Sequence, residues 1–429
     1  MTTPTRTATD GEPTRNPVRR FFSALGPGLI TGAADDDPSG VATYSVAGAR
    51  LGTSLLWTAA LTWPLMAVVQ MTCARIGMVT GQGLAGAMRR KLPKSLIVVF
   101  STLLLLANTI NIASDLAGMA DAAEMLTGLD SHFFVVVFGV GIAWATVRLR
   151  YYQIAMILKW LALTLFAYVL TAILVGPDWV EVARSAFLPT FPGGREWFGS
   201  LVAILGTTIS PYLFFWQAGQ EVEEEKALGR RMLVQRVSAS PREFATRRLD
   251  VGVGTFFSNL VMFFIILATA LTLHRHGLSN IETSRQAAEA LTPLAGKFAA
   301  LLYTVGIIGV GLLAIPTLSG SAAYAFAETF RWRHGLDLKF RRARYFYEVV
   351  IFSTLAGIAL DFLNVNPIKA LYWTAILNGL LAPFLLIGIV LVASDRNVMA
   401  GQPSSRVSLL VILATALLMF AAALGLFVL

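Results

Sequence analysis

Cysteine is almost missing from this sequence, in which Cys73 is the single example. One cysteine cannot form an internal disulfide, and it excludes a metal site built from several thiolates. Histidine is also scarce, and only His274 and His276 lie close together along the chain. We interpret this pair as part of a solvated loop. The sequence has no HExxH-type motif and no recognisable nucleophile–base pair, so we expect neither an enzyme nor a bound cofactor.

Charged residues are few, at 14% of the chain, where a soluble protein carries about 25%. Hydrophobic residues make up 56% and the mean hydropathy is +0.67. These values exclude an ordinary soluble domain and favour a polytopic membrane protein whose immediate partner is the lipid bilayer. The first 20 residues are polar and rich in Thr, Pro and Arg. We predict that they form a disordered cytoplasmic tail rather than a secretory signal, because they contain no apolar core.

Eleven apolar runs are long enough to cross a bilayer, which takes about 20 residues. They cover residues 24–49, 54–75, 95–125, 131–148, 152–175, 197–219, 251–273, 298–329, 344–362, 367–394 and 407–428. The connections between them are too short for a soluble domain. The sequence therefore predicts an all-α membrane protein with a single transmembrane domain over residues 21–429.

Lys and Arg are distributed unevenly between the two sides of these runs. Most of the 34 basic residues fall in the tail and in alternate connections, at 89–94, 148–151, 220–250, 330–344 and 395–406. By the positive-inside rule, this bias places the N-terminus in the cytoplasm and, after eleven crossings, the C-terminus outside the cell membrane. It also accounts for the net charge of +9 without a nucleic-acid partner, because basic loops lie against anionic headgroups.

The first apolar run is interrupted by the stretch AADDDPSG, residues 33–40. Pro38 removes a backbone donor and disfavours a helical conformation at Asp37. Such a break survives at membrane depth only where it faces protein or water, and a carboxylate there is a functional candidate. The alternative is a surface turn before the first span, but the apolar residues ahead of it would then be too few to cross the membrane.

A second break falls in the sixth run, at GTTISPY, residues 206–212. Taken alone, it is explained by a proline kink whose hydroxyls repair the backbone. Paired with the break five segments earlier, it indicates an inverted-repeat transporter with its site between the two broken helices. The side chains available there offer carboxylate and hydroxyl oxygens, which suit hard cations such as Mg²⁺, Ca²⁺ or Mn²⁺.

The stretches GPGLITGAADDDPSGVAT, IASDLAG, GTTISPY and LAPF resemble the Nramp family of divalent-metal transporters. The resemblance implies a LeuT-type fold, with two inverted five-helix repeats and with segments 1 and 6 unwound at the metal site. It places repeat one at about residues 21–176, repeat two at about 190–395 and an eleventh helix at about 407–428. It also implies a divalent metal ion as the substrate; the oligomeric state is not implied, and a monomer is sufficient.

Several positions depart from the family's motifs. The family's liganding Asp is kept as Asp37. Gly40 stands where the family has a liganding Asn, and Ser210 where it has Met. Tyr212 replaces the family's His, and Gly118 replaces the Glu of its proton route. These changes resemble the Nramp-related magnesium transporter branch. Losing the Met sulfur removes a preference for soft ions, and a wider pocket suits Mg²⁺, which keeps several waters. Losing His and Glu removes two titratable groups from the proton route.

We therefore predict a secondary transporter that moves Mg²⁺, with Mn²⁺ as a second candidate ion, into the cytoplasm by alternating access without proton coupling. The predicted metal-site residues are Asp37, Gly40, Thr207 and Ser210. The predicted transport pathway comprises Asp36, Thr208, Tyr212, Asp115, Gly118, Gln217 and Asn378. Two alternatives stay open: a proton-coupled Mn²⁺ or Fe²⁺ importer of the Nramp type, and a sodium-coupled symporter of organic solutes on the same fold.

Polar residues elsewhere in the runs allow two interpretations. Asn111 could line the pathway or form an interhelical hydrogen bond. The acidic residues of 221–225 could attract cations at an exit, or they could form a solvated helix end that faces the basic residues of 226–250.

Overall fold

The protein is described by a computed structural model that covers residues 27–149, 163–230, 232–363 and 365–428. The predicted disordered tail lies outside these residues. The described chain is helical, without strands. The helices of its first half are α2 (Pro27–Asp35), α3 (Pro38–Leu51), α4 (Trp57–Thr80), α5 (Leu84–Met88), α6 (Lys94–Thr127), α7 (Ser131–Arg148), α9 (Phe166–Val175), α10 (Trp179–Phe187), α11 (Arg195–Thr208) and α12 (Pro211–Ala227). Those of its second half are α13 (Pro241–Thr272), α14 (Ser284–Glu289), α15 (Thr292–Ala295), α16 (Ala299–Phe330), α17 (Arg344–Asp361), α18 (Pro367–Ala393) and α19 (Arg406–Val428).

Each of the eleven predicted segments coincides with a helix or a pair of helices, although the fifth is described only from residue 163. Among the described residues, eight helical stretches are long and apolar enough by themselves to cross a membrane. Segment 1 is divided between α2 and α3, and segment 6 between α11 and α12. Both predicted breaks are therefore present.

The two prolines begin helices instead of bending them. Pro38 is the first residue of α3 and Pro211 the first residue of α12. Proline is tolerated at this position because the N–H that it lacks would have no partner in the first turn. Asp37 caps α3, and its side chain accepts a hydrogen bond from the Gly40 amide. The local sequence thus explains why the chain leaves one helix and starts another at these two points.

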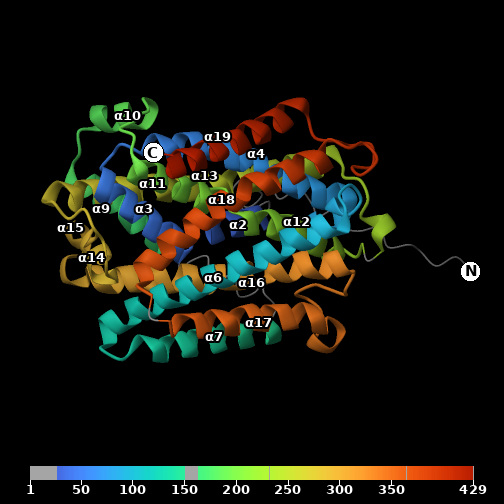
Figure 1. Ribbon diagram of the computed structural model, residues 1–429, viewed down its shortest axis with the longest axis horizontal. Coiled ribbons are helices and arrows are strands. Elements are labelled where there is room, and N and C mark those ends of the chain that lie inside the picture. Colours follow the sequence, from blue (N-terminus) through green and yellow to red (C-terminus); the bar gives the residue numbers. More distant parts are fainter. Residues whose placement is uncertain (1–26, 150–162, 231, 364, 429) are drawn as a thin grey trace, which may run out of the picture.

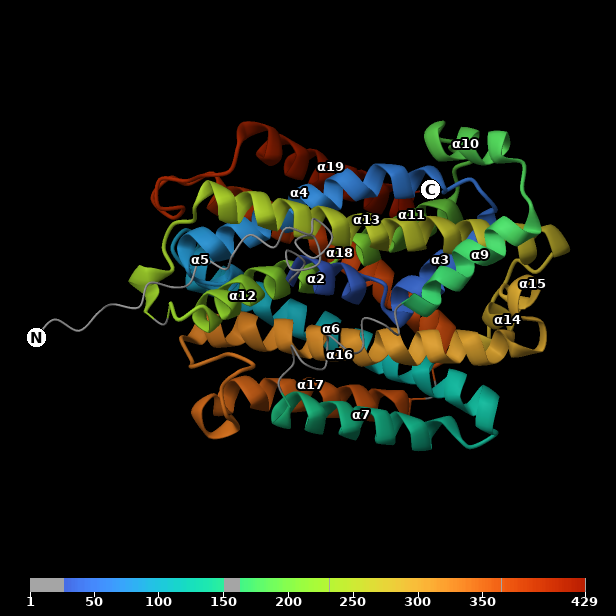
Figure 2. The same cartoon turned by 180° about the vertical axis from the view of Figure 1, so that it is seen from behind.

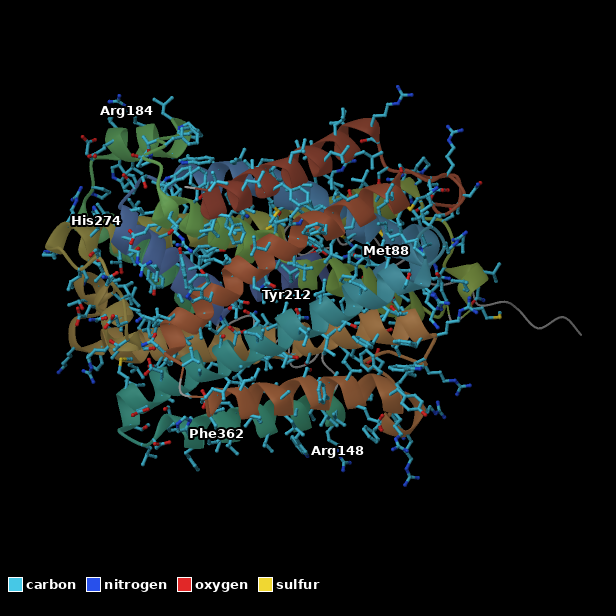
Figure 3. The ribbon with its side chains drawn as sticks, in the orientation of Figure 1. Met88, Arg148, Arg184, Tyr212, His274 and Phe362 are labelled. Carbon is cyan, nitrogen blue, oxygen red and sulfur yellow. The ribbon has the colours of Figure 1, made fainter. Side chains whose placement is uncertain are left out.

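The helices run roughly along the long axis of the molecule (Figure 1). Helices α7 and α17 form one edge, α4 and α19 lie at the opposite edge, and α2, α3, α11 and α12 lie between them, as the reverse view confirms (Figure 2). Tyr212, at the start of α12, lies near the middle of this length (Figure 3). The breaks in segments 1 and 6 are thus enclosed by the surrounding helices.

Glycines allow the inner helices to approach closely. A Cβ atom on Gly206 of α11 would overlap the backbone of Ala375 and Gly379 in α18, and one on Gly32 of α2 would overlap Gly254 of α13. Small residues permit such backbone contacts between membrane helices. Helix α11 is thereby held against α18, and α2 against α13.

Candidate metal site and its two exits

Asp37 lies at the centre of the first break and is 2% exposed. Its Oδ1 atom accepts a hydrogen bond from the Gly40 amide at 2.6 Å. Its Oδ2 atom accepts one from Asn111 Nδ2 of α6 at 3.1 Å and a longer one from the Tyr212 hydroxyl of α12 at 3.4 Å. The carboxylate is therefore oriented by donors from three helices. Asn111, for which the sequence left two roles open, bonds directly to the candidate ligand.

The second break is joined to the first by the Tyr212 hydroxyl, which also donates to the Ala34 carbonyl at 2.9 Å. Ser210 directly precedes Pro211 at the start of α12, and its side chain makes no capping hydrogen bond there. Its hydroxyl donates to the carbonyls of Gly206 at 2.8 Å and Thr207 at 2.7 Å. These bonds satisfy carbonyls that the break frees, and they leave the lone pairs of Ser210 as acceptors.

Gly40 and Thr207 bring the two breaks into contact. A Cβ atom on Gly40 would lie 3.2 Å from Thr207 Oγ1 and 3.5 Å from Asp37 Oδ1. The structure thus brings together the four predicted metal-site positions, with Asp37 and Gly40 on one break and Thr207 and Ser210 on the other. The Thr208 hydroxyl does not bond to this group; it donates to the Ile204 carbonyl of its own helix at 2.8 Å.

Three further carboxylates are buried near Asp37. Asp35 and Asp36 share the hydroxyl of Ser258 on α13, which donates to Asp35 Oδ2 at 2.6 Å and lies 3.3 Å from Asp36 Oδ1. Asp115 of α6 is fully buried and interacts electrostatically with Asp37, and neither of its carboxylate oxygens has a hydrogen bond of ordinary geometry. Sequence reasoning missed Ser258; its only signal was a Ser-Asn pair in the middle of the seventh run.

These four carboxylates have no cationic partner within the described part of the chain: no Lys, Arg or His nitrogen lies within 4.0 Å of them. Buried ionised groups are costly unless they are paired. The described residues also contain no group of three or more His, Cys, Asp or Glu side chains that converge as a metal cluster. The groups that hydrogen-bond directly to Asp37, from Gly40, Asn111 and Tyr212, are neutral.

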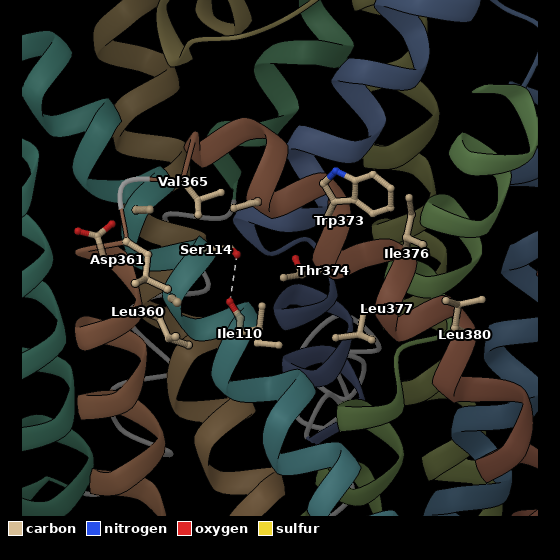
Figure 4. A pocket seen from close by; sticks show the side chains of 14 residues that line it. Ile110, Ser114, Leu360, Asp361, Val365, Trp373, Thr374, Ile376, Leu377 and Leu380 are labelled. Atoms are coloured by element: carbon tan, nitrogen blue, oxygen red, sulfur yellow. Dashed lines mark hydrogen bonds between the residues drawn. The ribbon is translucent and has the colours of Figure 1, made fainter. Parts of the chain in front are cut away.

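A cavity of about 450 Å³ lies between α6, α17 and α18, and the four predicted metal-site residues do not line it. Its wall is mostly apolar, and the hydroxyls of Ser114 and Thr374 point into the space between α6 and α18 (Figure 4). Thr374 Oγ1 lies 3.4 Å from Ser39 Oγ, two residues beyond Asp37. The cavity extends along the bundle to Asp361 and Val365, at the end predicted to lie outside.

On the predicted cytoplasmic side of the breaks, hydrogen bonds hold α2 closed against α12. The Thr31 hydroxyl of α2 donates to Gln217 Oε1 at 2.7 Å, and Gln217 Nε2 donates to Glu221 Oε1 at 2.7 Å. Gln217 is fully buried. The predicted pathway residue Gln217 therefore lies in a contact that ties the two inner half-helices together.

Arg247 of α13 completes this closure. It forms ion pairs with Glu221 at 2.7 Å, with Asp250 at 2.5 Å and with Glu224. Asp250 Oδ2 in turn accepts a hydrogen bond from the Gly28 amide of α2 at 2.7 Å. We call this group, together with Thr31 and Gln217, the Arg247 network.

The acidic residues of 221–225 do face basic residues of 226–250, but the interpretation of a solvated helix end is wrong for two of them. Glu221 and Glu225 are 2% and 6% exposed. Glu225 pairs with Arg230 at 2.6 Å. The physical reason is that α12 continues beyond the apolar run while packed against α4 and α16, and that Arg230 and Arg247 cover the two carboxylates.

Two other predicted pathway residues, Gly118 and Asn378, are buried but do not hydrogen-bond to Asp37. Gly118 packs where a Cβ atom would lie 3.0 Å from Leu371 and 3.8 Å from Pro38, so a larger side chain there would displace Leu371. Asn378 is 3% exposed on α18, next to Gly379, which contacts Gly206 at the second break.

Comparison with known proteins places this geometry in context. The profile of the natural resistance-associated macrophage protein-like (Nramp) family matches residues 28–429. The divalent metal cation transporter MntH of Deinococcus radiodurans is 26% identical over 400 residues, which cover 91% of this chain and 86% of that protein. The transporter of the same name from Yersinia pestis is 27% identical over 321 residues, covering 71% of this chain and 73% of that protein.

Solved structures share the fold. The manganese transporter of Eremococcus coleocola, in complex with an aromatic bis-isothiourea substituted compound, superposes with a TM-score of 0.69 at 17% identity, covering 96% of this chain and 89% of that chain. The closed conformation of Mhp1, a nucleobase-cation-symport-1 family transporter, gives a TM-score of 0.54 at 15% identity, covering 94% and 92%. At such identities the likeness concerns the fold alone. It confirms the LeuT-type architecture; the predicted boundaries of the repeats stay a prediction.

Proposed function

This chain belongs to the Nramp family of divalent metal cation transporters, and within that family we propose that it carries Mg²⁺ into the cytoplasm by alternating access, without proton coupling. The observation that carries the proposal is the set of ligands around Asp37. They are oxygens from a carboxylate, hydroxyls and backbone carbonyls at two helix breaks. Hard oxygen ligands favour Mg²⁺, Ca²⁺ and Mn²⁺ over softer transition metals.

The short residues beside Asp37 support the choice of Mg²⁺. At Gly40 a Cβ atom would already lie 3.2 Å from Thr207 Oγ1, so the position accommodates glycine, and the longer family Asn would have to displace its neighbours. Ser210 likewise replaces a longer thioether with a short hydroxyl. Mg²⁺ dehydrates reluctantly and usually keeps several waters. A site with one carboxylate at its centre and short side chains in place of bulkier ligands is suited to a partly hydrated ion.

The surroundings of Tyr212 and Gly118 support the absence of proton coupling. Tyr212 donates its hydroxyl proton to the Ala34 carbonyl, and a phenol does not titrate near neutral pH. Gly118 provides no titratable group, and its neighbours Leu371 and Pro38 fill the space around it. The two positions that serve the family's proton route are therefore occupied here by residues that neither gain nor lose a proton near neutral pH.

The driving force is sufficient without protons. A membrane potential of about 100 mV is worth roughly 2.3 kcal/mol per charge, so about 4.6 kcal/mol for a divalent cation. That energy supports a gradient of about three decades at about 1.4 kcal/mol per decade. On the orientation that the basic residues predict, with the N-terminus in the cytoplasm and the C-terminus outside, a negative interior draws the ion inward.

The direction of closure fits an alternating-access cycle. The Arg247 network ties α2 and α12 to α13 at the predicted cytoplasmic end. The cavity between α6, α17 and α18 reaches the other end. In the proposed cycle, the network opens after an ion has bound at Asp37, and α2 and α12 separate to release the ion inward.

A second candidate function is a proton-coupled Mn²⁺ importer. The observation that favours it is the survival of Asp35, Asp36 and Asp115, which are buried within reach of the site. Any of these carboxylates has the chemistry to carry a proton.

One experiment separates the two functions. Purified protein is reconstituted into liposomes that contain a fluorescent Mg²⁺ or Mn²⁺ indicator and a pH-sensitive dye, with the potential clamped by a potassium ionophore. We expect Mg²⁺ uptake without a change of internal pH. Metal-dependent acidification that empty liposomes do not show would favour the coupled function, and uptake of Mn²⁺ without Mg²⁺ would overturn the proposed selectivity.

A further inference from the structure

A second polar cavity, also of about 450 Å³, lies at the predicted cytoplasmic end of the molecule. It is bounded by the turn between α4 and α5, by α12, by the segment around residues 233–236 and by the C-terminal end of α16. Five basic side chains line it: Arg89, Arg90, Lys226, Arg236 and Arg331. We propose that this cavity is a binding site for a phosphate-bearing anion.

Two of the guanidinium groups are positioned by neutral acceptors. Arg89 Nη1 donates to the backbone carbonyl of Glu328 at 2.9 Å. Arg90 donates to the carbonyls of Val398 and Asn397, each at 3.1 Å. A carbonyl orients a guanidinium without cancelling its charge. These bonds therefore present preformed cations to the cavity, with donors left over for a ligand.

The electrostatics of the cavity indicate an excess of positive charge. Burial and the neighbouring Arg331 lower the pKa of Arg89. Burial, Lys226 and Arg236 lower the pKa of His334, which also lines the cavity, to about 4. His334 is therefore neutral at pH 7, and adding a proton to this space is unfavourable. The same field is favourable for an anion.

The acidic groups near the cavity do not remove this excess. Glu328 is the one carboxylate in the lining; its Oε2 accepts from the Gly86 amide at 3.0 Å, and its carboxylate fills the space that a Cβ on Gly83 would take. Lys226 pairs with Glu223 at 2.7 Å. Glu223 and Glu225 also lie near Arg236, so three carboxylates face five basic side chains.

The ligand class follows from this chemistry. A guanidinium presents parallel N–H donors that match two oxygens of a phosphate group, and adjacent guanidiniums favour a dianion. The volume exceeds what a single inorganic ion needs and falls in the range of small-molecule sites. A soluble phosphate compound of the cytoplasm and the headgroup of an anionic phospholipid share this chemistry.

Occupancy would connect helices that must separate during transport. Lys226 lies on α12, the inner half of the broken sixth segment, while Arg331 follows α16 and Arg89 follows α5. An anion held by all three adds contacts that exist only in the closed arrangement. We therefore expect bound phosphate to slow metal flux; this effect on flux rests on the proposed transport function, whereas binding itself does not.

Binding is tested on the purified full-length chain in two arms. In detergent, the unfolding temperature is measured against inorganic phosphate at constant ionic strength set with chloride. In nanodiscs of phosphatidylglycerol or phosphatidylcholine, native mass spectrometry counts retained lipid. The test variant is Arg89→Gln/Arg331→Gln. The matched control is Arg333→Gln, because Arg333 is exposed near Arg331 and does not line the cavity.

We expect the double variant to weaken phosphate binding about tenfold or more, since it loses charge-assisted hydrogen bonds, and the control to bind like the parent chain. A phosphate-dependent shift that the double variant loses assigns the site to a soluble ligand. Retention of phosphatidylglycerol alone, lost in the same variant, assigns it to a lipid headgroup. No phosphate shift and no selective lipid retention, or equal loss in the control, would overturn the proposal. Arg331→Lys provides a milder variant if the double variant does not fold; it keeps the charge and should retain part of the binding.

Discussion

Asp37 and Glu221 are both buried carboxylates on the broken helices, but their surroundings differ in one respect. Glu221 lies 2.7 Å from Arg247, which also pairs with Asp250. Asp37 receives hydrogen bonds from neutral donors and, among the described residues, no cation reaches it. A buried ion pair supplies its own counter-charge, whereas an unpaired buried carboxylate is stabilised by a cation from outside.

This difference separates the function of the two regions. The Arg247 network is complete without a ligand, so it suits a closure that holds α2, α12 and α13 together. The group around Asp37, with Asp35, Asp36 and Asp115 nearby, gains most from an incoming cation. A transporter needs both kinds of site, because one must bind the ion and the other must open after binding.

Replacing Asp37 tests the comparison most severely. Asp37→Asn keeps the cap on α3 but removes the charge, and Asp37→Ala removes both. We expect either variant to reduce metal flux in proteoliposomes to the level of empty liposomes, because Asp37 is the carboxylate that bonds to Tyr212 of the second broken segment. Asp337→Asn, at an exposed position, is the control and should transport normally. Normal flux in folded Asp37→Ala would contradict the assignment of the central ligand.

Removing the cation of the Arg247 network should lower the free energy of unfolding instead. Arg247→Gln leaves Glu221 and Asp250 buried without their partner, and breaking such a pair costs about 3–5 kcal/mol. We expect a clearly lower unfolding temperature and faster labelling of cysteines introduced on the inner half of α2. Arg248→Gln is the control, since Arg248 is the exposed neighbour on the same helix.

A second-site change sharpens this test. If the penalty arises from unpaired charge, then Glu221→Gln/Asp250→Asn in the Arg247→Gln background should recover part of the lost stability. A triple variant no more stable than the single variant would mean that Arg247 acts through packing.

Selectivity should shift when the family's ligands are restored at the first region. Gly40→Asn with Ser210→Met adds an amide and a thioether and narrows the space beside Thr207. We expect about tenfold weaker Mg²⁺ transport and stronger Mn²⁺ or Cd²⁺ binding, measured by flux and by calorimetry. Gly40→Ala, which adds only a methyl group, controls for crowding. An unchanged preference in the double variant would move the origin of selectivity elsewhere, with Thr207 as the next candidate.

The smallest expected effect concerns His334. It is a half-buried base among cations, whereas Asp37 is a buried acid hydrogen-bonded to neutral groups. Its pKa is lowered from 6.5 to about 4 by burial, Lys226 and Arg236. The folded state therefore binds this proton less readily than the unfolded state, so stability falls as the pH drops from about 6.5 towards 4. We expect His334→Gln to remove about 1–2 kcal/mol of the loss between pH 7 and pH 5. The check compares unfolding temperatures at the two pH values with those of His276→Gln; the same acid loss in both variants would exclude His334 as its source.

The sequence by itself determined the features that depend on neighbouring residues. Apolar length defined the eleven segments, and Pro38 and Pro211 defined where two of them break, because a proline acts on its own turn of backbone. Asp37, Thr207 and Ser210 were predicted as site residues for the same reason, because they flank those breaks, and Gly40 was predicted through the resemblance to the Nramp family.

Only the tertiary structure decided which side chains complete the site and close it. Asn111 and Ser258 reach the aspartates from α6 and α13, and Arg247 reaches Glu221 across 26 positions of the chain. No local pattern identifies such partners. A polar residue inside an apolar run looks the same in the sequence whether it bonds to a metal-site residue, to another helix or to a member of the Arg247 network. The burial of Glu221 was also decided there, since an acidic run is solvated or enclosed according to the helix that packs against it.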